Sequence, residues 1–210
     1  MKAYLKIEKQ SLPYHVERSF LNALKHTAKE HGYTGPYAQI AFLWARTKDH
    51  WLQVVSRIMP FNGVRVELQR MRGVRIGPDV HIGPMVTIDD VYPYFVSIGR
   101  GSSIAGQNFI LTHTKPLEYH KDVSEAFVAP VVIGKNVWIA INVVILPGVT
   151  IGEGSIVASG SVVTKSIPPF VFAAGIPAQT KKDISQKLKR NYTDDQFNKI
   201  LEKRKQEWGF

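Results

Sequence analysis

Residues 131–151 read VVIGKNVWIAINVVILPGVTI, and isoleucine returns in this stretch at every sixth position. The same six-residue step extends to both sides, and its positions are Ile76, Ile82, Ile88, Ile98, Ile104, Ile110, Ile133, Ile139, Ile145, Ile151, Val157 and Val163. Neither a helix of 3.6 residues per turn nor an alternating strand produces this step. It is typical of a β-solenoid, in which short strands stack coil on coil and the repeated aliphatic side chain fills the axis.

The row of aliphatic positions spaced six residues apart, which we call the ladder, is interrupted twice. Ile88 and Ile98 are ten residues apart, which predicts a short bulge over residues 91–94. Ile110 and Ile133 are 23 residues apart, which predicts an excursion loop over residues 112–130. Long loops within regular repeats usually carry function, so the loop is the first place to look for a site.

The net charge of +10 lies outside the ladder. Residues 1–73 carry 12 Lys/Arg and 5 Asp/Glu, residues 74–179 carry 6 and 7, and residues 180–210 carry 9 and 5. Basic flanks suit a polyanionic cofactor or peripheral contact with an anionic membrane surface. We expect no nucleic-acid partner, because no recognised nucleic-acid motif accompanies the charge. With no cysteine and no signal peptide, we expect a cytoplasmic protein, at the inner face of the membrane if the flanks touch lipid.

The flanks are expected to be helical. Residues 11–31 repeat an apolar residue every fourth position between a capping Ser11 and a terminating Gly32. A second helix is predicted over residues 37–58, stopped by Pro60 and packed on the solenoid as a cap, with a position on a membrane as the alternative. The predicted division is a helical N-terminal cap (1–73), a β-helix (74–179) and a basic helical tail (180–210).

Two histidines and two carboxylates are the candidates for chemistry. The excursion loop reads LTHTKPLEYH over residues 111–120 and contains His113 and His120. Histidine is suited to taking a proton near neutral pH, although two idle, exposed histidines would give the same pattern. Asp89 and Asp90 follow the ladder position Ile88, directly before the first interruption. They could bind substrate hydroxyls, orient an imidazole or mark a turn.

Five motifs in the second half of the chain resemble the hexapeptide-repeat acyltransferases. They are VWIA at 137–140, ILPGVTIG at 145–152, ASGSVVTK at 158–165, IPP at 167–169 and AGIPA at 174–178. The resemblance covers residues 74–182 and is nearest to the sugar O-acetyltransferases, including those acting on capsular or lipopolysaccharide glycans. It implies a left-handed parallel β-helix of about four coils and a homotrimer with sites between neighbouring solenoids. It also implies acetyl-CoA as co-substrate, a sugar or glycan acceptor and no metal.

The same resemblance implies roles for individual residues. His113 would be the base, with His120 in reserve, because Lys115 stands where the maltose-type relatives have their histidine. Asp89, Asp90 and His120 are expected to bind the acceptor. The residues expected to bind the cofactor are Trp138, Ala140, Ser159, Gly160, Thr164 and Lys165 along the pantetheine channel, and Lys181 and Lys182 at the nucleotide phosphates.

The mechanism expected from these residues is direct transfer, because a chain without cysteine favours a ternary complex over an acyl-enzyme. Other readings stay open. The acceptor could be serine or an amino sugar. The γ-class carbonic anhydrases share the solenoid and would use three histidines such as His81, His113 and His120. A non-enzymatic scaffold is the third class.

Overall fold

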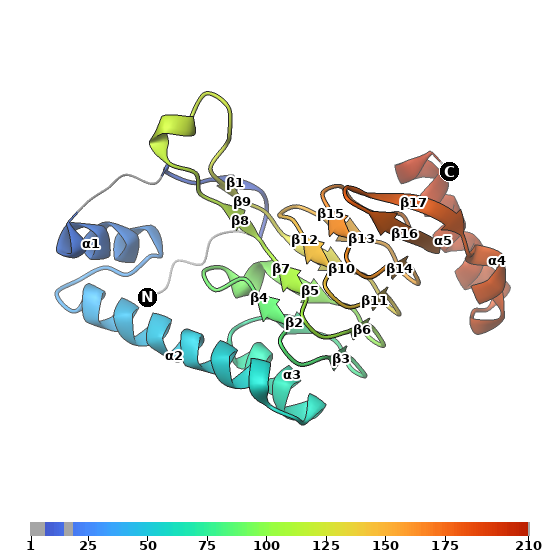
Figure 1. Ribbon diagram of the computed structural model, residues 1–210, viewed down its shortest axis with the longest axis horizontal. Helices are drawn as coiled ribbons and strands as arrows, with labels where there is room; N and C mark the ends of the chain where they lie inside the picture. Colours follow the sequence, from blue (N-terminus) through green and yellow to red (C-terminus); the bar gives the residue numbers. More distant parts are fainter. Residues whose placement is uncertain (1–6, 15–18, 210) are drawn as a thin grey trace.

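The computed structural model describes residues 7–14 and 19–209, and its centre is a parallel β-helix built from three sheets (Figure 1). The sheets have the strand orders β13-β10-β5-β2, β17-β16-β14-β11-β6-β3 and β15-β12-β7-β4, so the chain visits each sheet in turn as it advances. Their strands are β2 (Arg75–Ile76), β3 (His81–Ile82), β4 (Thr87–Ile88), β5 (Val96–Ile98), β6 (Ser103–Ile104), β7 (Phe109–Ile110), β10 (Val131–Ile133), β11 (Trp138–Ile139), β12 (Val144–Ile145), β13 (Thr150–Ile151), β14 (Ile156–Val157), β15 (Val162–Val163), β16 (Val171–Gly175) and β17 (Ala178–Asp183).

The six-residue ladder forms the core, as predicted. Every ladder side chain from Ile82 to Val163 is at most 2% exposed, and Ile76 in the first coil packs partly buried against them. In-register pairs such as Ile98 with Ile133 and Ile104 with Ile139 stack the same position of successive coils. The ladder side chains therefore form columns that run along the inside of the solenoid.

The corners between strands have their own repeat. The residue three positions after a ladder position has a positive φ, as at Asp79, Met85, Gly101, Gln107, Asn136, Asn142, Gly148, Gly154 and Gly160. The left-handed turn favours Gly, Asn and Asp, which explains most of these residue types. Coils also approach closely at the corners, since a Cβ on Gly99 would lie 2.6 Å from the carbonyl carbon of Gly134.

Small polar residues buried at the corners are hydrogen-bonded to the next coil. Ser102 Oγ donates to Gly134 O at 2.8 Å and accepts from Val137 N at 3.1 Å. Asn108 Oδ1 accepts from Val143 N at 2.6 Å. Buried polar groups are stable only when satisfied in this way.

The two interruptions differ from the sequence-based expectation in detail. Residues 91–94 do not bulge into solvent, because a 3-10 turn, η1 (Pro93–Phe95), buries Tyr92 and Phe95 against the loop. The excursion over 112–130 contains β8 (His113–Thr114), η2 (Glu118–His120) and β9 (Phe127–Val128). These two strands join β1 (Gln10–Ser11) in an antiparallel sheet of order β1-β9-β8.

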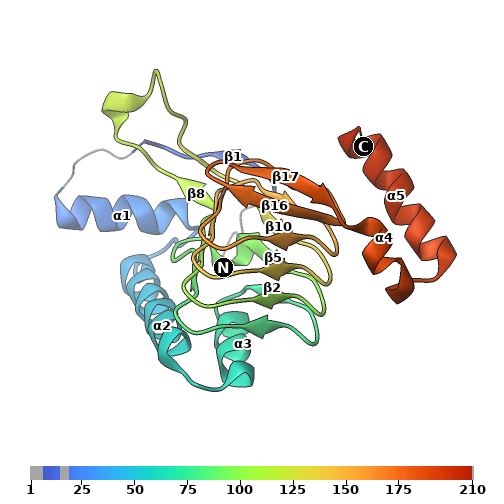
Figure 2. The same ribbon diagram turned by 45° about the vertical axis from the view of Figure 1, so that its right-hand side comes forward.

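The N-terminal helices are α1 (Phe20–Glu30), α2 (Ala38–Ile58) and α3 (Asn62–Met71). The predicted second helix is confirmed, and α3 was not predicted. The predicted start of the first helix at Ser11 is wrong, since Ser11 lies in β1; Val16 of that pattern lies outside the described residues. In Figure 2, α2 and α3 lie beside the lower coils, and α3 contacts β2 and β3 while α2 contacts α3 and β4.

The C-terminal segment begins with a strand. β17 pairs antiparallel with β16, and the predicted boundary between residues 179 and 180 falls inside it. The helices α4 (Ser185–Leu188) and α5 (Asp194–Trp208) and the 3-10 turn η3 (Lys189–Asn191) follow. The predicted three-part division stays a prediction. In the described part of the chain, no helix has the length and apolar content needed to cross a bilayer.

Candidate functional site

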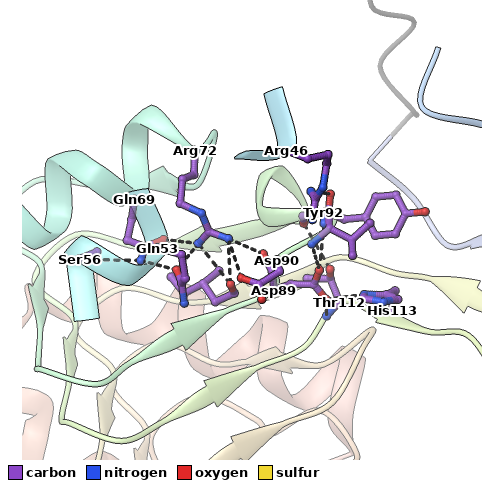
Figure 3. Close-up of polar contacts among 12 residues, drawn as sticks. Arg46, Gln53, Ser56, Gln69, Arg72, Asp89, Asp90, Tyr92, Thr112 and His113 are labelled. Carbon is purple, nitrogen blue, oxygen red and sulfur yellow. Dashed lines mark hydrogen bonds and ion pairs between the residues drawn. The ribbon is translucent and has the colours of Figure 1, made fainter. Parts of the chain in front are cut away.

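His113 and Asp89 form a hydrogen-bonded pair where the excursion leaves the solenoid. His113 lies on β8, three residues beyond the ladder position Ile110, and Asp89 follows β4 in the coil below. The Nδ1 atom of His113 lies 2.6 Å from Asp89 Oδ2. The imidazole is 26% exposed, whereas the Asp89 side chain is fully buried. A rigid strand end therefore presents a partly accessible imidazole held from behind by a carboxylate (Figure 3).

The Asp89 carboxylate accepts hydrogen bonds from the backbone as well. Val91 N and Tyr92 N donate to Oδ1 at 2.8 and 2.9 Å, and Thr112 N donates to Oδ2 at 2.9 Å. Burial by itself would raise the pKa of Asp89. The hydrogen bond and charge of His113, with the Tyr92 and Thr112 N–H groups, outweigh it and lower this pKa to about 2. The carboxylate is therefore ionised at neutral pH.

The ionised carboxylate determines the tautomer of His113. A carboxylate can only accept, so the hydrogen bond at 2.6 Å requires a proton on Nδ1. In the neutral imidazole this leaves the lone pair on Nε2, the nitrogen not bound to Asp89. The pair has the geometry of a base with an orienting carboxylate.

A buried network connects the helices to Asp89. Arg72, at the end of α3, donates to Asp89 O at 2.9 Å and to Ile88 O at 3.2 Å. It also donates to Gln69 Oε1 at 2.7 Å and to Gln53 Oε1, and it pairs with Asp90 at 3.3 Å. Burial lowers the pKa of Arg72 to about 10, so it stays charged at neutral pH. The network fixes the strand end from which the Asp89 side chain projects (Figure 3).

Aromatic rings pack around the pair. The ring of Tyr92 meets the His113 imidazole edge to face, with centroids 5.3 Å apart, and it stacks on His31 of the α1–α2 connection at the same distance. A pocket of about 240 Å³ lies beyond His31, lined by residues that include Tyr33, Phe42, Arg46 and Tyr94. His113 does not line this pocket.

The residues predicted to bind the acceptor differ in how far they are buried. Asp89 was expected to contact the acceptor; its side chain is fully buried and bonded to His113, so the geometry favours the orienting role over a contact with the acceptor. Asp90 is half exposed and pairs with Arg72. His120 lies exposed in η2, where its ring contacts Tyr119. Of the two loop histidines, the structure brings His113 to Asp89.

The residues expected to bind the cofactor lie on the surface of the upper coils. Trp138 is 53% exposed on β11, and Ala140 N donates to Val157 O in the neighbouring coil. Ser159, Gly160, Thr164 and Lys165 are exposed at the corners after β14 and β15. Lys181 and Lys182 are exposed on β17, where Lys182 pairs with Phe172. Three exposed ammonium groups and an indole fit a ligand that is anionic at one end.

Arg72, Gln53 and Gln69 are functional-site residues that were not predicted from the sequence. Its position in the sequence could have indicated Arg72. It lies directly before Gly73 and the first coil, where an N-terminal helix has to end next to the solenoid. Nothing in the sequence pairs it with Asp89. For the carbonic-anhydrase alternative, the described residues of one chain contain no group of three or more His, Cys, Asp or Glu side chains placed to hold an ion.

Known proteins share this architecture. Residues 130–165 match the bacterial transferase hexapeptide family (six repeats). The chain is 38% identical to the galactoside O-acetyltransferase of Escherichia coli (strain K12) over 127 residues, which are 57% of this chain and 61% of the relative. It is 33% identical over 141 residues to YvoF of Bacillus subtilis (strain 168), named as an acetyltransferase, which covers 65% of this chain and 78% of the relative.

A solved galactoside acetyltransferase in complex with coenzyme A matches the structure with a TM-score of 0.53 and 28% sequence identity, covering 72% of this chain and 86% of the other. The parallel β-helix places the chain in the class of hexapeptide-repeat proteins, with a His–Asp pair beside its excursion loop. The matches identify the family within this class. The chain belongs to the hexapeptide-repeat transferase family. It spans less than two thirds of the length of the Escherichia coli relative.

Proposed function

We propose that the protein is an acetyl-CoA-dependent O-acetyltransferase that acts on a hydroxyl group of a sugar or of a bacterial surface polysaccharide. The observation that carries the proposal is the His113–Asp89 pair at 2.6 Å in a chain related to the galactoside O-acetyltransferase. The relatives support acetyl transfer to sugars, and the pair supplies the base that such a reaction needs.

His113 is the general base of the proposed reaction. Its Nε2 atom takes the proton of the acceptor hydroxyl, while Asp89 holds the Nδ1 proton and stabilises the imidazolium that forms. The acceptor oxygen bonds to the acetyl carbon as the carbon–sulfur bond breaks, and His113 returns the proton to the leaving sulfur. General-base assistance of this kind typically supplies about 10²–10⁴-fold in rate.

Acetyl-CoA supplies the activated acetyl group as a thioester, and the exposed residues of the upper coils fit it. Lys181 and Lys182 on β17 place two ammonium groups in reach of phosphates, and Trp138 offers an exposed ring surface on the same sheet. The solved galactoside acetyltransferase with coenzyme A supports this choice of co-substrate. Asp90 and His120 are proposed to contact the acceptor.

We also propose the finer features that the family resemblance implies. The solenoid winds left-handed in about four coils, and three chains assemble with sites between neighbours. The partial exposure of the His113 imidazole, 26%, supports a site completed by a second chain. From the lack of cysteine and the basic flanks, rather than from the resemblance, we propose that the enzyme works in the cytoplasm, where its flanks can contact the inner face of the membrane.

A screen of glycan and small-molecule acceptors tests the function. Purified protein is incubated with acetyl-CoA and each acceptor, and thiol release is measured beside a no-acceptor control. Acetylation of a sugar hydroxyl, verified by mass spectrometry, is the expected result. If acetyl transfer is confined to amines or to serine, the proposed sugar hydroxyl is wrong and the acceptor is an amine or serine.

A further inference from the structure

Helix α2 turns its apolar side outward and its polar side inward. Ile40, Trp44, Trp51 and Ile58 are between 60% and 75% exposed, although they are among the largest apolar side chains of the helix. On the opposite side Gln53 and Ser56 are 2% exposed, with Phe42 as the buried apolar residue. A helix on the surface of a globular protein normally has the reverse arrangement.

The exposed side chains form a continuous stripe. Its positions, spaced four and three residues apart, are Ile40, Trp44, Thr47, Trp51, Val54 and Ile58, of which Thr47 is polar and Val54 is half-buried, and Phe61 extends it beyond the helix at 69% exposed. Residues at this spacing lie on one face of a helix. We call these seven residues the α2 stripe. Contiguous apolar surface of this kind marks an interaction site.

The helix cannot rotate to bury the stripe without losing the network beneath it. Gln53 Oε1 accepts from Gln69 Nε2 at 2.8 Å and from Arg72, and Ser56 Oγ accepts from Gln69 Nε2 at 3.0 Å. These bonds hold the polar side of α2 against α3 and the strand end at Asp89. The stripe is therefore held outward by the same contacts that support the site.

The charges beside the stripe indicate an anionic partner. At 3.6 residues per turn, Lys48 and Arg57 lie about 80–100° to either side of its centre. Asp49, the one acidic residue within Ala38–Ile58, lies on the side of the helix opposite the stripe centre and lines the pocket, and its carboxylate pairs with Lys48 Nζ at 3.5 Å. Residues 38–73 contain six Lys/Arg and two Asp/Glu, but Arg65 and Arg72 are buried and Arg70 pairs with Glu67, so Lys48 and Arg57 supply the positive charge beside the stripe. A two-fold contact between two copies of this face would bring like charges together, whereas an anionic lipid surface complements them.

The residue types favour lipid as well. Tryptophan is enriched where a membrane meets water, because its ring is apolar and its N–H is polar. Two tryptophans in one stripe suit a fluid surface better than the layers of a coiled coil, which favour branched aliphatic side chains. We propose that α2 lies in the headgroup region of an anionic phospholipid bilayer, with the α2 stripe facing the acyl chains.

Vesicle flotation with the full-length protein tests this proposal, and its readout does not depend on acetyl transfer. The wild type is expected to float with vesicles that mix phosphatidylglycerol into phosphatidylcholine, and less with phosphatidylcholine alone. The double variant Trp44→Gln/Trp51→Gln is expected to bind the mixed vesicles at least about 10-fold more weakly, because it loses two buried rings. Lys48→Gln is expected to weaken binding about fivefold.

The matched control is Tyr119→Gln/Val123→Gln, which changes two large residues of the excursion loop that are more exposed than the two tryptophans, at 89% and 83%. It should bind vesicles like the wild type. Failure of the wild type to bind mixed vesicles at low salt would overturn the proposal. So would a double variant that binds normally. A double variant whose mass in light scattering falls below that of the wild type, with equal vesicle binding, would assign the stripe to a subunit interface instead.

Discussion

At the residue scale, His113 and Asp89 act together in taking the proton of the acceptor hydroxyl, and each side chain can be replaced separately. His113→Ala is expected to lower kcat at least about 10²-fold, because it removes the proton acceptor, while acetyl-CoA binding persists. His120→Ala should have a much smaller effect, mainly on the acceptor KM, because His120 lies in the exposed η2 turn without a carboxylate partner among the described residues. Steady-state kinetics on both variants checks the order. The reverse order would make His120 the base.

Asp89→Asn tests the orienting role of the carboxylate. The amide side chain of this variant would turn an NH₂ group toward at least one of the four donors that Asp89 accepts from, and so disfavours the Nδ1-protonated tautomer of His113. The expected result is a loss of kcat of about 10²-fold or more with an unchanged KM for acetyl-CoA. A loss confined to KM would mean that Asp89 acts on ligand binding rather than on His113.

The same residue predicts a pH dependence of stability. The pKa of Asp89 is lowered from 3.8 to about 2 in the folded protein. Its ionised form therefore contributes about 2–3 kcal/mol to the free energy of unfolding above pH ~4, and this contribution is lost as the pH falls toward 2. Urea unfolding at fixed protein concentration should show a large gap between wild type and Asp89→Asn at pH 6 and a smaller one at pH 3. A gap that stays constant would contradict the assigned pKa.

At the scale of elements, the repeated strands of the solenoid were predicted from the sequence, whereas the packing of the helices, which follows no repeat, was not. The isoleucine ladder specified strand positions and the core, because a six-residue step with in-register stacking leaves one place for each side chain. Helix α2 was predicted from its length and its terminating Pro60. Its orientation was not, since a stripe of Ile40, Trp44 and Trp51 predicts burial and the structure exposes it. The reason is the polar network of Arg72, whose long-range partners no local pattern indicates.

Arg72→Met tests the link between the helical cap and the site. The change removes the Arg72 donor from Ile88 O, Asp89 O and Gln69 Oε1, while Gln53 Oε1 keeps its bond from Gln69 Nε2, and this should cost about 3 kcal/mol in the free energy of unfolding. In the folded fraction, kcat should fall and the KM for acetyl-CoA should stay the same. Thermal unfolding and steady-state kinetics measure the two effects.

Arg70→Met is the matched control for this change. Arg70 also lies on α3 and also donates to strand carbonyls, at Ile76 and Gly77, but it is partly exposed and remote from Asp89. It should destabilise less and leave kcat unchanged. Equal losses of kcat in the two variants would show that the whole cap, rather than Arg72, supports the site.

At the scale of the whole molecule, we propose that a second chain completes the site. The His113 imidazole is 26% exposed, and the basic residues Lys181 and Lys182 lie on β17, at the other end of the coil stack from β2. The repeats and the C-terminal motifs could place both groups on the solenoid from sequence. Sequence could not say whether they serve the same site, because that depends on how chains pack together.

Mixing two defective variants tests whether neighbouring chains share a site. Lys181→Ala/Lys182→Ala should raise the KM for acetyl-CoA and leave kcat nearly unchanged, because the two ammonium groups act on phosphates. This variant and His113→Ala are unfolded together, refolded as a mixture and assayed at acetyl-CoA well below the raised KM. If each site in a cyclic trimer takes His113 from one chain and the lysines from the next, about a quarter of the sites should regain both groups. Activity clearly above that of either variant refolded alone is the expected result. No gain, in mixtures that light scattering shows to be trimeric, would place His113 and the lysines of one site on a single chain.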